Sequence, residues 1–212
     1  MNKSFTIDIA DKALLVRNYL IRTNDYIENK IDSTLPPVQP FRGNGQIKLA
    51  IIGQDPTIRN TKHRERISCT LNLDKKGTLK TYIENICKGL GITLDNVYAT
   101  NVFKYFYTVP PADTPHVLVA HFQPNLALLK KELSQYPYCP IITLGEPVLQ
   151  LLTDKKHKVR DYWKYEKTNF HYISASENLL GRPIYPFPHQ PSLRKELYKT
   201  NLTHYLAYMA KK

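Results

Sequence analysis

The strongest constraint on the fold is a set of short, mostly apolar runs that alternate with helix-like segments. The runs cover residues 48–52, 96–102 and 140–144, and Gly53 and Gly145 directly follow the first and the third. A short apolar run that ends at a glycine is typical of a buried strand in a parallel sheet. Strands that alternate with helices predict an α/β layered sandwich with a mostly parallel sheet.

The remaining segments complete this layout. Apolar spacing predicts helices over 4–30, 78–90, 117–133 and 193–210, another helix starting at 146–152, and two further short strands over 170–174 and 183–187. The proline-rich stretch 35–40 predicts an extended linker, because proline disfavours helix in the residue before it. The run 155–160 is typical of a solvated basic surface. We expect one domain over 1–212, in which 1–45 form a helical extension and linker.

Composition limits the classes of function. The chain has 212 residues, a formal net charge of +12 and a pI near 9.5, which favours a polyanionic partner such as nucleic acid or an anionic membrane surface. No apolar run is long enough to cross a membrane, and residues 1–11 lack the apolar core of a signal peptide. The three cysteines include no CxxC pair, so we expect a reduced, cytoplasmic protein without a metal site.

Polar residues follow the predicted strands at the edge where α/β proteins bind ligands. Because the carboxyl ends of parallel strands meet there, the segments 53–60, 101–104 and 145–147 should face one crevice. Gly53 permits a sharp turn, and the proline after Asp55 fixes the backbone, so this carboxylate is held where it can orient a water molecule. The alternative is that Asp55 only forms an Asx turn at the end of a strand.

Three segments of the chain carry motifs in a fixed order. Residues 53–56 read Gly-Gln-Asp-Pro, residues 85–90 read Asn-Ile-Cys-Lys-Gly-Leu, and residues 97–104 contain Thr-Asn-Val-Phe-Lys with a Pro-Pro pair beyond them. In this order they resemble the water-activating motif GQDPY, the helix written NI-x-K-x-L and the base-recognition strand of the uracil-DNA glycosylase superfamily. The last segment is most similar to that of the thermophilic branch with an iron–sulfur cluster.

Two later segments extend the resemblance, which covers residues 48–195. Residues 141–145 resemble the strand before the phosphate-contacting turn. Residues 189–193 resemble the closing motif HPS, with Gln190 inserted. The resemblance implies a three-layer α/β/α sandwich around a short, mostly parallel central sheet.

The resemblance also implies a role for each matching residue at the crevice. Asp55 corresponds to the carboxylate that positions water at the sugar carbon and stabilises the positive charge that develops there. The backbone N–H of Gln54 corresponds to a donor to uracil O2. Asn101 corresponds to the amide that reads uracil, because it can accept from N3–H and donate to O4. His189 corresponds to the catalytic histidine, which donates to O2 as negative charge develops.

Further matches imply contacts with DNA whose target nucleotide is extruded from the helix. Ser192 corresponds to a backbone-phosphate contact, and Leu193 to the apolar wedge that fills the space of the extruded base. Basic residues that flank the motifs are expected to bind phosphates: Lys62, Arg64, Arg66 and Arg194, with His63 and Lys195 beside them. The alternative for each of these is a solvated surface.

The sequence departs from the family pattern in several places. Thr57 replaces the tyrosine that excludes the thymine methyl group, so we expect weaker discrimination against 5-methyl and 5-hydroxymethyl uracil. Residues 67–71 lack the phenylalanine that stacks on uracil, and the candidates to replace it are Tyr105, Phe106 and Tyr107. Glu146 stands where a serine contacts phosphate, and its charge would repel the phosphate. The four cysteines of an iron–sulfur cluster are absent, so we expect no cofactor.

These observations favour a cofactor-free, monomeric DNA glycosylase of base excision repair, which hydrolyses the N-glycosidic bond of uracil or of a related damaged pyrimidine. One alternative is a non-catalytic DNA-binding protein on the same fold. Another is an unrelated α/β enzyme that acts on a nucleotide or a phosphorylated small molecule, although the chain has no P-loop or GxGxxG motif. At single residues, the structural alternatives are a strand-end cap for Asn101 and a surface histidine for His189.

Overall fold

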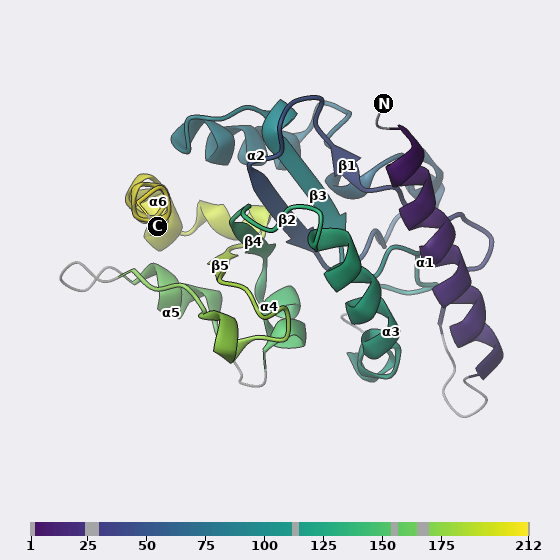
Figure 1. Cartoon of the computed structure of the whole chain (residues 1–212). Coiled ribbons are helices and arrows are strands. Elements are labelled where there is room, and N and C mark those ends of the chain that lie inside the picture. The colour runs from purple at the N-terminus through teal and green to yellow at the C-terminus, as the bar shows by residue number, and fades with distance from the viewer. Residues whose placement is uncertain (1–2, 24–29, 112–114, 154–156, 165–169, 212) are drawn as a thin grey trace.

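The structure is a computed structural model that describes residues 3–23, 30–111, 115–153, 157–164 and 170–211. A five-stranded sheet in the order β1-β3-β2-β4-β5 lies at its centre (Figure 1). The strands are β1 (Phe41–Arg42), β2 (Leu49–Gly53), β3 (Val97–Asn101), β4 (Ile141–Leu144) and β5 (Ile184–Phe187). β1 runs antiparallel to β3 and the other neighbours are parallel, which confirms the predicted mostly parallel sheet.

The parallel strands form where the apolar runs lie. Every residue of β2, β3, β4 and β5 is buried. Side chains such as isoleucine and valine favour a pleated surface that is covered on both faces. Each of these strands begins and ends within one residue of its predicted run. The short antiparallel strand β1 was not predicted, because two half-buried residues carry no periodic signal.

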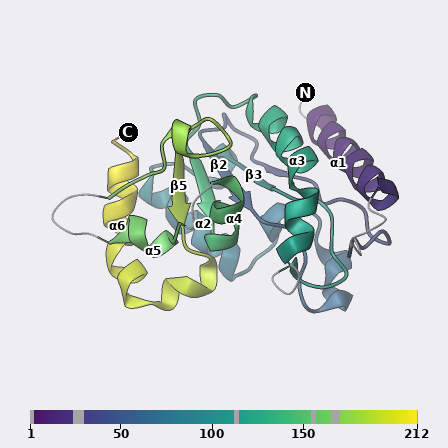
Figure 2. The ribbon, with the colours of Figure 1, turned by 90° about the horizontal axis from the view of Figure 1, so that it is seen from below.

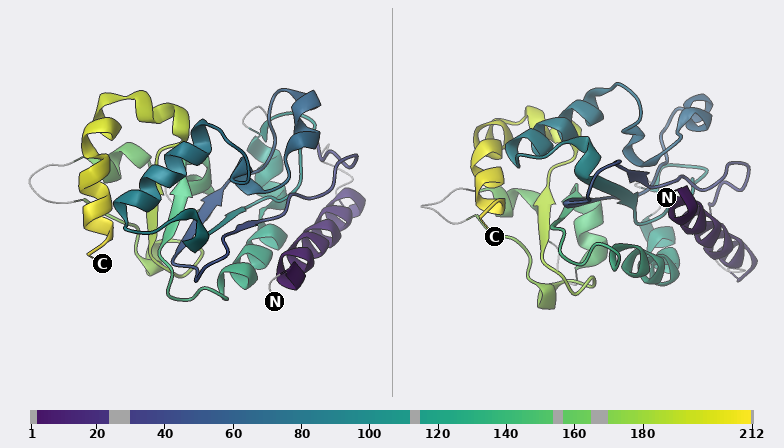
Figure 3. Two further views of the ribbon diagram at one scale, coloured as in Figure 1. Left: turned by 90° about the horizontal axis from the view of Figure 1, so that it is seen from above. Right: turned by 45° about the horizontal axis from the view of Figure 1, so that its top comes forward.

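Helices cover both faces of the sheet. They are α1 (Lys3–Thr23), α2 (Thr78–Gly89), α3 (Pro115–Leu133), α4 (Glu146–Leu152), α5 (Val159–Trp163) and α6 (Glu196–Met209). α2 and α6 lie on one face, and α3 and α4 lie on the other, which gives the three expected layers (Figures 1 and 2). α1 packs on the outside of α3 (Figure 3). Within the described ranges, none of these helices is both long and apolar enough to span a membrane.

One predicted strand is much shorter than expected, and one predicted helix is described only in part. The strand predicted over 170–174 is reduced to one bridge between Ile173 and Ile184, after which the chain turns into a 3-10 helix. The first helix is described over Lys3–Thr23, and residues 24–29, which were also predicted as helical, lie outside the described residues.

The segment predicted as a solvated basic run is partly structural. Its residues 155 and 156 lie outside the described residues, but Val159 begins α5 and is buried, as is Trp163 one turn later. These two apolar side chains anchor α5 to the core, whereas the basic side chains on either side of Val159, Lys158 and Arg160, are exposed as predicted. The closing helix starts at Glu196 rather than at 193, and a 3-10 helix, Gln190–Arg194, precedes it.

The N-terminal helix is held against α3 by apolar contacts and by one arginine. Ile9 and Ala13 pack with Leu128 of α3 in a small buried cluster. The guanidinium of Arg17 donates to the backbone carbonyl of Leu35 at 2.6 Å, which ties the helix to the linker that follows it.

The linker itself lies beside the segment that follows β3. The backbone N–H of Asp32 donates to the carbonyl of Phe106 at 2.9 Å, and that of Val38 donates to the carbonyl of Lys104 at 2.6 Å. The linker is therefore extended, as the prolines predict, and it supports a segment that begins directly after a predicted site residue.

Candidate active site

A cavity of about 460 Å³ opens at the carboxyl ends of the parallel strands, a size typical of small-molecule sites. The segments that follow β2, β3, β4 and β5 all contribute to its lining, as predicted from the topology. Six of the predicted site residues line it together: Gln54, Asp55, Thr57, Asn101, His189 and Ser192. The fold therefore brings these residues together in one crevice, although they are far apart in the sequence.

The Asp55 carboxylate is fixed at the cavity by the turn after β2. Its Oδ1 accepts a hydrogen bond from the backbone N–H of Thr57 at 2.7 Å, which is an Asx turn. The Thr57 hydroxyl in turn accepts from the backbone N–H of Tyr107 at 2.8 Å. The Asx turn that was the structural alternative for Asp55 is therefore present. Because Asp55 also lines the cavity, the turn is compatible with a chemical role for this carboxylate.

Burial raises the pKa of Asp55 to about 6. The hydrogen bonds from Thr57 and the positive charge of Arg64 oppose this shift, but they do not cancel it. A carboxylate with a pKa of this size is mostly ionised at pH 7, and it can still exchange a proton near neutral pH. It therefore has the charge needed to hold a water molecule or to stabilise a nearby cation.

The Asn101 amide faces the cavity with an unused acceptor. Asn101 ends β3, where it pairs in register with Gly53, and its side chain is buried. Within the described residues, its Oδ1 is buried and has no hydrogen-bond partner. A buried acceptor without a partner is costly, so its position in a cavity points to a ligand that donates a hydrogen bond.

His189 also lines the cavity, two residues after the end of β5. Its Cβ lies close to Gly145, where a Cβ atom would stand only 3.3 Å away, and Gly145 has a φ of +89° that favours glycine. Although His189 is exposed at the cavity mouth, partial burial lowers the pKa of its ring. The ring is then mostly neutral at pH 7 and can donate one N–H.

The closing motif is a turn of 3-10 helix rather than the start of a long helix. The backbone N–H of Ser192 donates to the carbonyl of His189 at 2.8 Å, so Gln190 is accommodated inside this turn. Ser192 reaches the cavity in this way. The side chain of Leu193 lies outside the described part of the structure.

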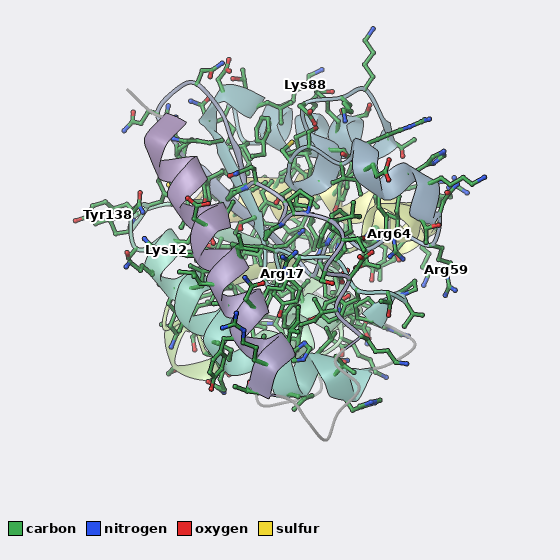
Figure 4. All side chains as sticks on the ribbon, turned by 90° about the vertical axis from the view of Figure 1, so that its right-hand side faces the viewer. Lys12, Arg17, Arg59, Arg64, Lys88 and Tyr138 are labelled. Atoms are coloured by element: carbon green, nitrogen blue, oxygen red, sulfur yellow. The ribbon has the colours of Figure 1, made fainter. Side chains whose placement is uncertain are left out.

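The expectation that Arg64 binds a phosphate is wrong. Its side chain is only 3% exposed, and its guanidinium donates to the backbone carbonyls of Ile58 at 3.0 Å and Tyr107 at 2.7 Å. It also pairs with Asp32 at 3.4 Å. Arg64 therefore fastens the loop after β2 to the segment after β3, whereas Arg59 projects from the periphery (Figure 4).

The aromatic residues that were candidates to stack on the base do not lie at the cavity. Tyr105, Phe106 and Tyr107 are all buried in the core and do not line the cavity. The Tyr105 hydroxyl accepts from Asn125, and that of Tyr107 bonds to His121, so these polar tips are used inside the protein.

A different ring, which the sequence did not single out, lies at the cavity. Among the lining residues that the structure describes, Tyr198 of α6 is the one aromatic, and Leu71 lies where the segment 67–71 meets the cavity. The apolar spacing of the closing helix could have indicated Tyr198 as buried, but not as a cavity residue.

A second cavity of about 600 Å³ adjoins the first and shares Asp55, Asn101 and His189 with it. Basic residues gather around it: His63, Arg66, Lys75, Lys76 and Lys80. The lysines stand at the start of α2 and were not predicted, although the Lys-Lys-Gly sequence before a helix is a visible signal. Lys62 and Arg194 are exposed, and their contact with phosphate stays a prediction.

Glu146 lines the first cavity at the turn after β4, so this turn presents a negative charge. The three cysteines, Cys69, Cys87 and Cys139, are free thiols. In the described ranges, no three His, Cys, Asp or Glu side chains gather in a way that could hold a metal ion.

Comparison with known proteins identifies the family. The family model described as the uracil DNA glycosylase superfamily matches residues 40–211, which is most of the chain. A comparison with curated proteins finds no match. The matched range contains the whole sheet and every residue named above in the first cavity, so this chain belongs to the uracil DNA glycosylase superfamily.

Proposed function

We propose that the protein is a DNA glycosylase that removes uracil, or a related damaged pyrimidine, by hydrolysing the N-glycosidic bond. The observation that carries the proposal is one cavity that holds a partly buried carboxylate, an unpartnered amide acceptor and a neutral histidine. These three groups are Asp55, Asn101 and His189. Family membership supports the same reaction class.

Base recognition rests on Asn101. Its Oδ1 accepts from N3–H of uracil, and its amide N–H donates to O4. Cytosine presents the reverse pattern at these positions, with an acceptor at N3 and an amino donor at C4. It would therefore leave the buried acceptor unpaired, which is how such sites reject a close analogue.

Bond cleavage rests on opposite charges that develop on the sugar and on the base. The Asp55 carboxylate stabilises the positive charge on the sugar and positions the attacking water. His189, with the backbone N–H of Gln54, donates to uracil O2 and stabilises the leaving uracil anion. Removing one such donor typically lowers the rate by about 10²–10³.

DNA binding follows from the position of the cavity and from the charge of its surroundings. A base in a duplex cannot reach a pocket of this kind, so the nucleotide is extruded. The net charge of +12 and the basic residues around the second cavity favour contact with phosphates on either side of the extruded base.

The test is cleavage of a labelled oligonucleotide with a single uracil, single-stranded or opposite G or A, followed by alkali. We expect cleavage by the unaltered protein and its loss in Asp55→Asn and His189→Ala. Glu84→Gln is the matched control, because Glu84 is exposed on α2 and does not line either cavity. Tight DNA binding without cleavage would instead support a non-catalytic DNA-binding protein.

A further inference from the structure

Behind the first cavity, a lysine and a glutamate form an ion pair without access to solvent. Nζ of Lys104 lies 2.8 Å from Oε2 of Glu132, and both side chains are 0% exposed. The Tyr98 hydroxyl donates to the other carboxylate oxygen of Glu132. Because Glu132 belongs to α3 and Tyr98 to β3, the pair connects the helix layer with the sheet.

Stability alone does not account for this ion pair. Moving two charges out of water is costly, and well-packed apolar residues in place of a buried pair often give an equally stable protein. The pair is better explained by what its polar atoms hold in place. Nζ of Lys104 also donates to the backbone carbonyl of Asn101 at 2.8 Å, and the Thr100 hydroxyl approaches the same oxygen at 3.5 Å.

This bond acts on the residue that carries the base-reading amide. After β3, the backbone N–H of Val102 donates to the carbonyl of Gly53, and that of Phe103 donates to the carbonyl of Gln54, each at 2.9 Å. The side chain of Lys104 then donates from Nζ to the carbonyl of Asn101, and this hydrogen bond closes the turn. The turn is thereby fixed both to the loop that carries the catalytic carboxylate and, through the ion pair, to α3.

We infer that Lys104, held by Glu132, is a positioning residue that fixes Asn101 for base recognition, an inference that rests on the proposed function. Lys104 does not line the first cavity, so it acts through Asn101 and not on the substrate. The buried Oδ1 of Asn101 has no hydrogen-bond partner among the described residues, so its use by a ligand depends on where the end of β3 holds it. A small movement at the end of β3 takes it out of hydrogen-bond distance from a base.

The experiment removes both charges together. The double variant Lys104→Met/Glu132→Gln leaves a carbonyl oxygen for the Tyr98 hydroxyl and leaves no unpaired buried charge. We expect its melting temperature and its KM for the oligonucleotide to stay close to those of the unaltered protein. We expect kcat for uracil excision to fall at least tenfold, and the inhibition constant of free uracil to rise about tenfold.

Two further variants separate positioning from folding. Lys104→Arg keeps a buried cation and its donors, so its affinity for free uracil should lie between that of the unaltered protein and that of the double variant. If the double variant folds poorly, the affinity of Lys104→Arg for free uracil is compared with that of the unaltered protein instead. Arg182→Met is the matched control. Arg182 also binds backbone carbonyls, those of Leu133, Tyr136 and Cys139, but it lies away from the cavity lining.

The control should lower the melting temperature without changing kcat or the inhibition by uracil. A folded double variant whose kcat and uracil inhibition stay within twofold of the unaltered protein would overturn the inference and leave the proposed function intact. If the unaltered protein neither excises nor binds uracil, both the proposed function and the inference fail.

Discussion

The side chain of Asn101 occupies the space above Gly53: a Cβ atom built on Gly53 would lie 2.3 Å from Oδ1 of Asn101. No real Cβ makes so close a contact, so any side chain at residue 53 displaces the amide. We therefore expect Gly53→Ala to lower the rate of uracil excision by at least 10², with the amide forced away from the base. The measurement is single-turnover cleavage of a uracil oligonucleotide.

Gly43→Ala is the control for this substitution. A Cβ on Gly43 would lie 2.3 Å from the carbonyl oxygen of Leu94, so the clash is equally severe but lies away from the cavity lining. We expect it to lower the melting temperature and to leave the rate per folded molecule unchanged. Equal losses of rate in the two variants would contradict the role given to Gly53.

The pH dependence of excision should follow the Asp55 carboxyl group. Because burial raises its pKa to about 6, the carboxylate is lost as the pH falls through 6. We expect kcat to decrease about tenfold for each pH unit below the pKa, with an apparent value near 6. The measurement is the pH profile of the single-turnover rate; a rate that is flat from pH 5 to 7 would exclude Asp55 as the ionised group.

Asp55→Asn should stabilise the protein while it abolishes excision. The pKa of Asp55 is about 6 in the folded protein and near 3.8 when exposed, so the folded state binds the proton more tightly. The group therefore destabilises the fold progressively as the pH rises from about 4 to 6, by on the order of 1–3 kcal/mol. Thermal denaturation should show a gain for Asp55→Asn at pH 7 that disappears at pH 4.

Base discrimination should depend on the small side chain at residue 57. Thr57 lines the cavity and is smaller than a tyrosine, so we expect excision of 5-hydroxymethyl uracil as well as uracil. Thr57→Tyr should raise the preference for uracil at least tenfold. Like Thr57→Tyr, the control Thr57→Ala removes the hydroxyl that accepts from the backbone N–H of Tyr107, but it adds no bulk. It should therefore lower the excision rates of both bases equally. Equally sharp rejection of 5-hydroxymethyl uracil by the unaltered protein would refute this role.

Substitutions of the basic residues near the cavities should fall into two groups, one that lowers the stability of the protein and one that changes the salt dependence of DNA binding. Arg64→Met leaves buried carbonyls unpaired, so it should lower stability by about 2–4 kcal/mol without changing the salt dependence of DNA binding. Lys76→Ala/Lys80→Ala should leave the melting temperature unchanged and reduce the salt slope by about 0.9 for each duplex phosphate contact that is lost. Binding isotherms at several salt concentrations distinguish the two outcomes.

The fold and the centre of the site could be predicted from local sequence. β2 and β4 are single apolar runs that end at a glycine, so their limits follow from the chain itself. Since parallel strands place their carboxyl ends together, the segments containing Asp55 and Asn101 had to meet. The motif order then added His189, which lies after the last strand.

The corrections concern residues whose environment is set by distant parts of the chain. Arg64 sits in a basic stretch, and its burial depends on carbonyl groups more than forty residues further along the sequence. The consecutive aromatic residues Tyr105, Phe106 and Tyr107 give no local signal of which side chain faces a cavity. The two tyrosines take their partners from α3, which supplies His121 and Asn125, and the backbone of Phe106 bonds to the linker at Asp32.

The contacts of the N-terminal helix and linker have a practical consequence for anyone who produces this protein in shorter form. The family match begins at residue 40, yet Ile9 and Ala13 cover Leu128 of α3, and Val38 bonds to the carbonyl of Lys104. A fragment cut at the start of the match would expose Leu128 on α3 and would lose the backbone hydrogen bond that supports the segment after Asn101. Such a fragment would aggregate during expression, and its inactivity would then say nothing about the chemistry of the intact chain.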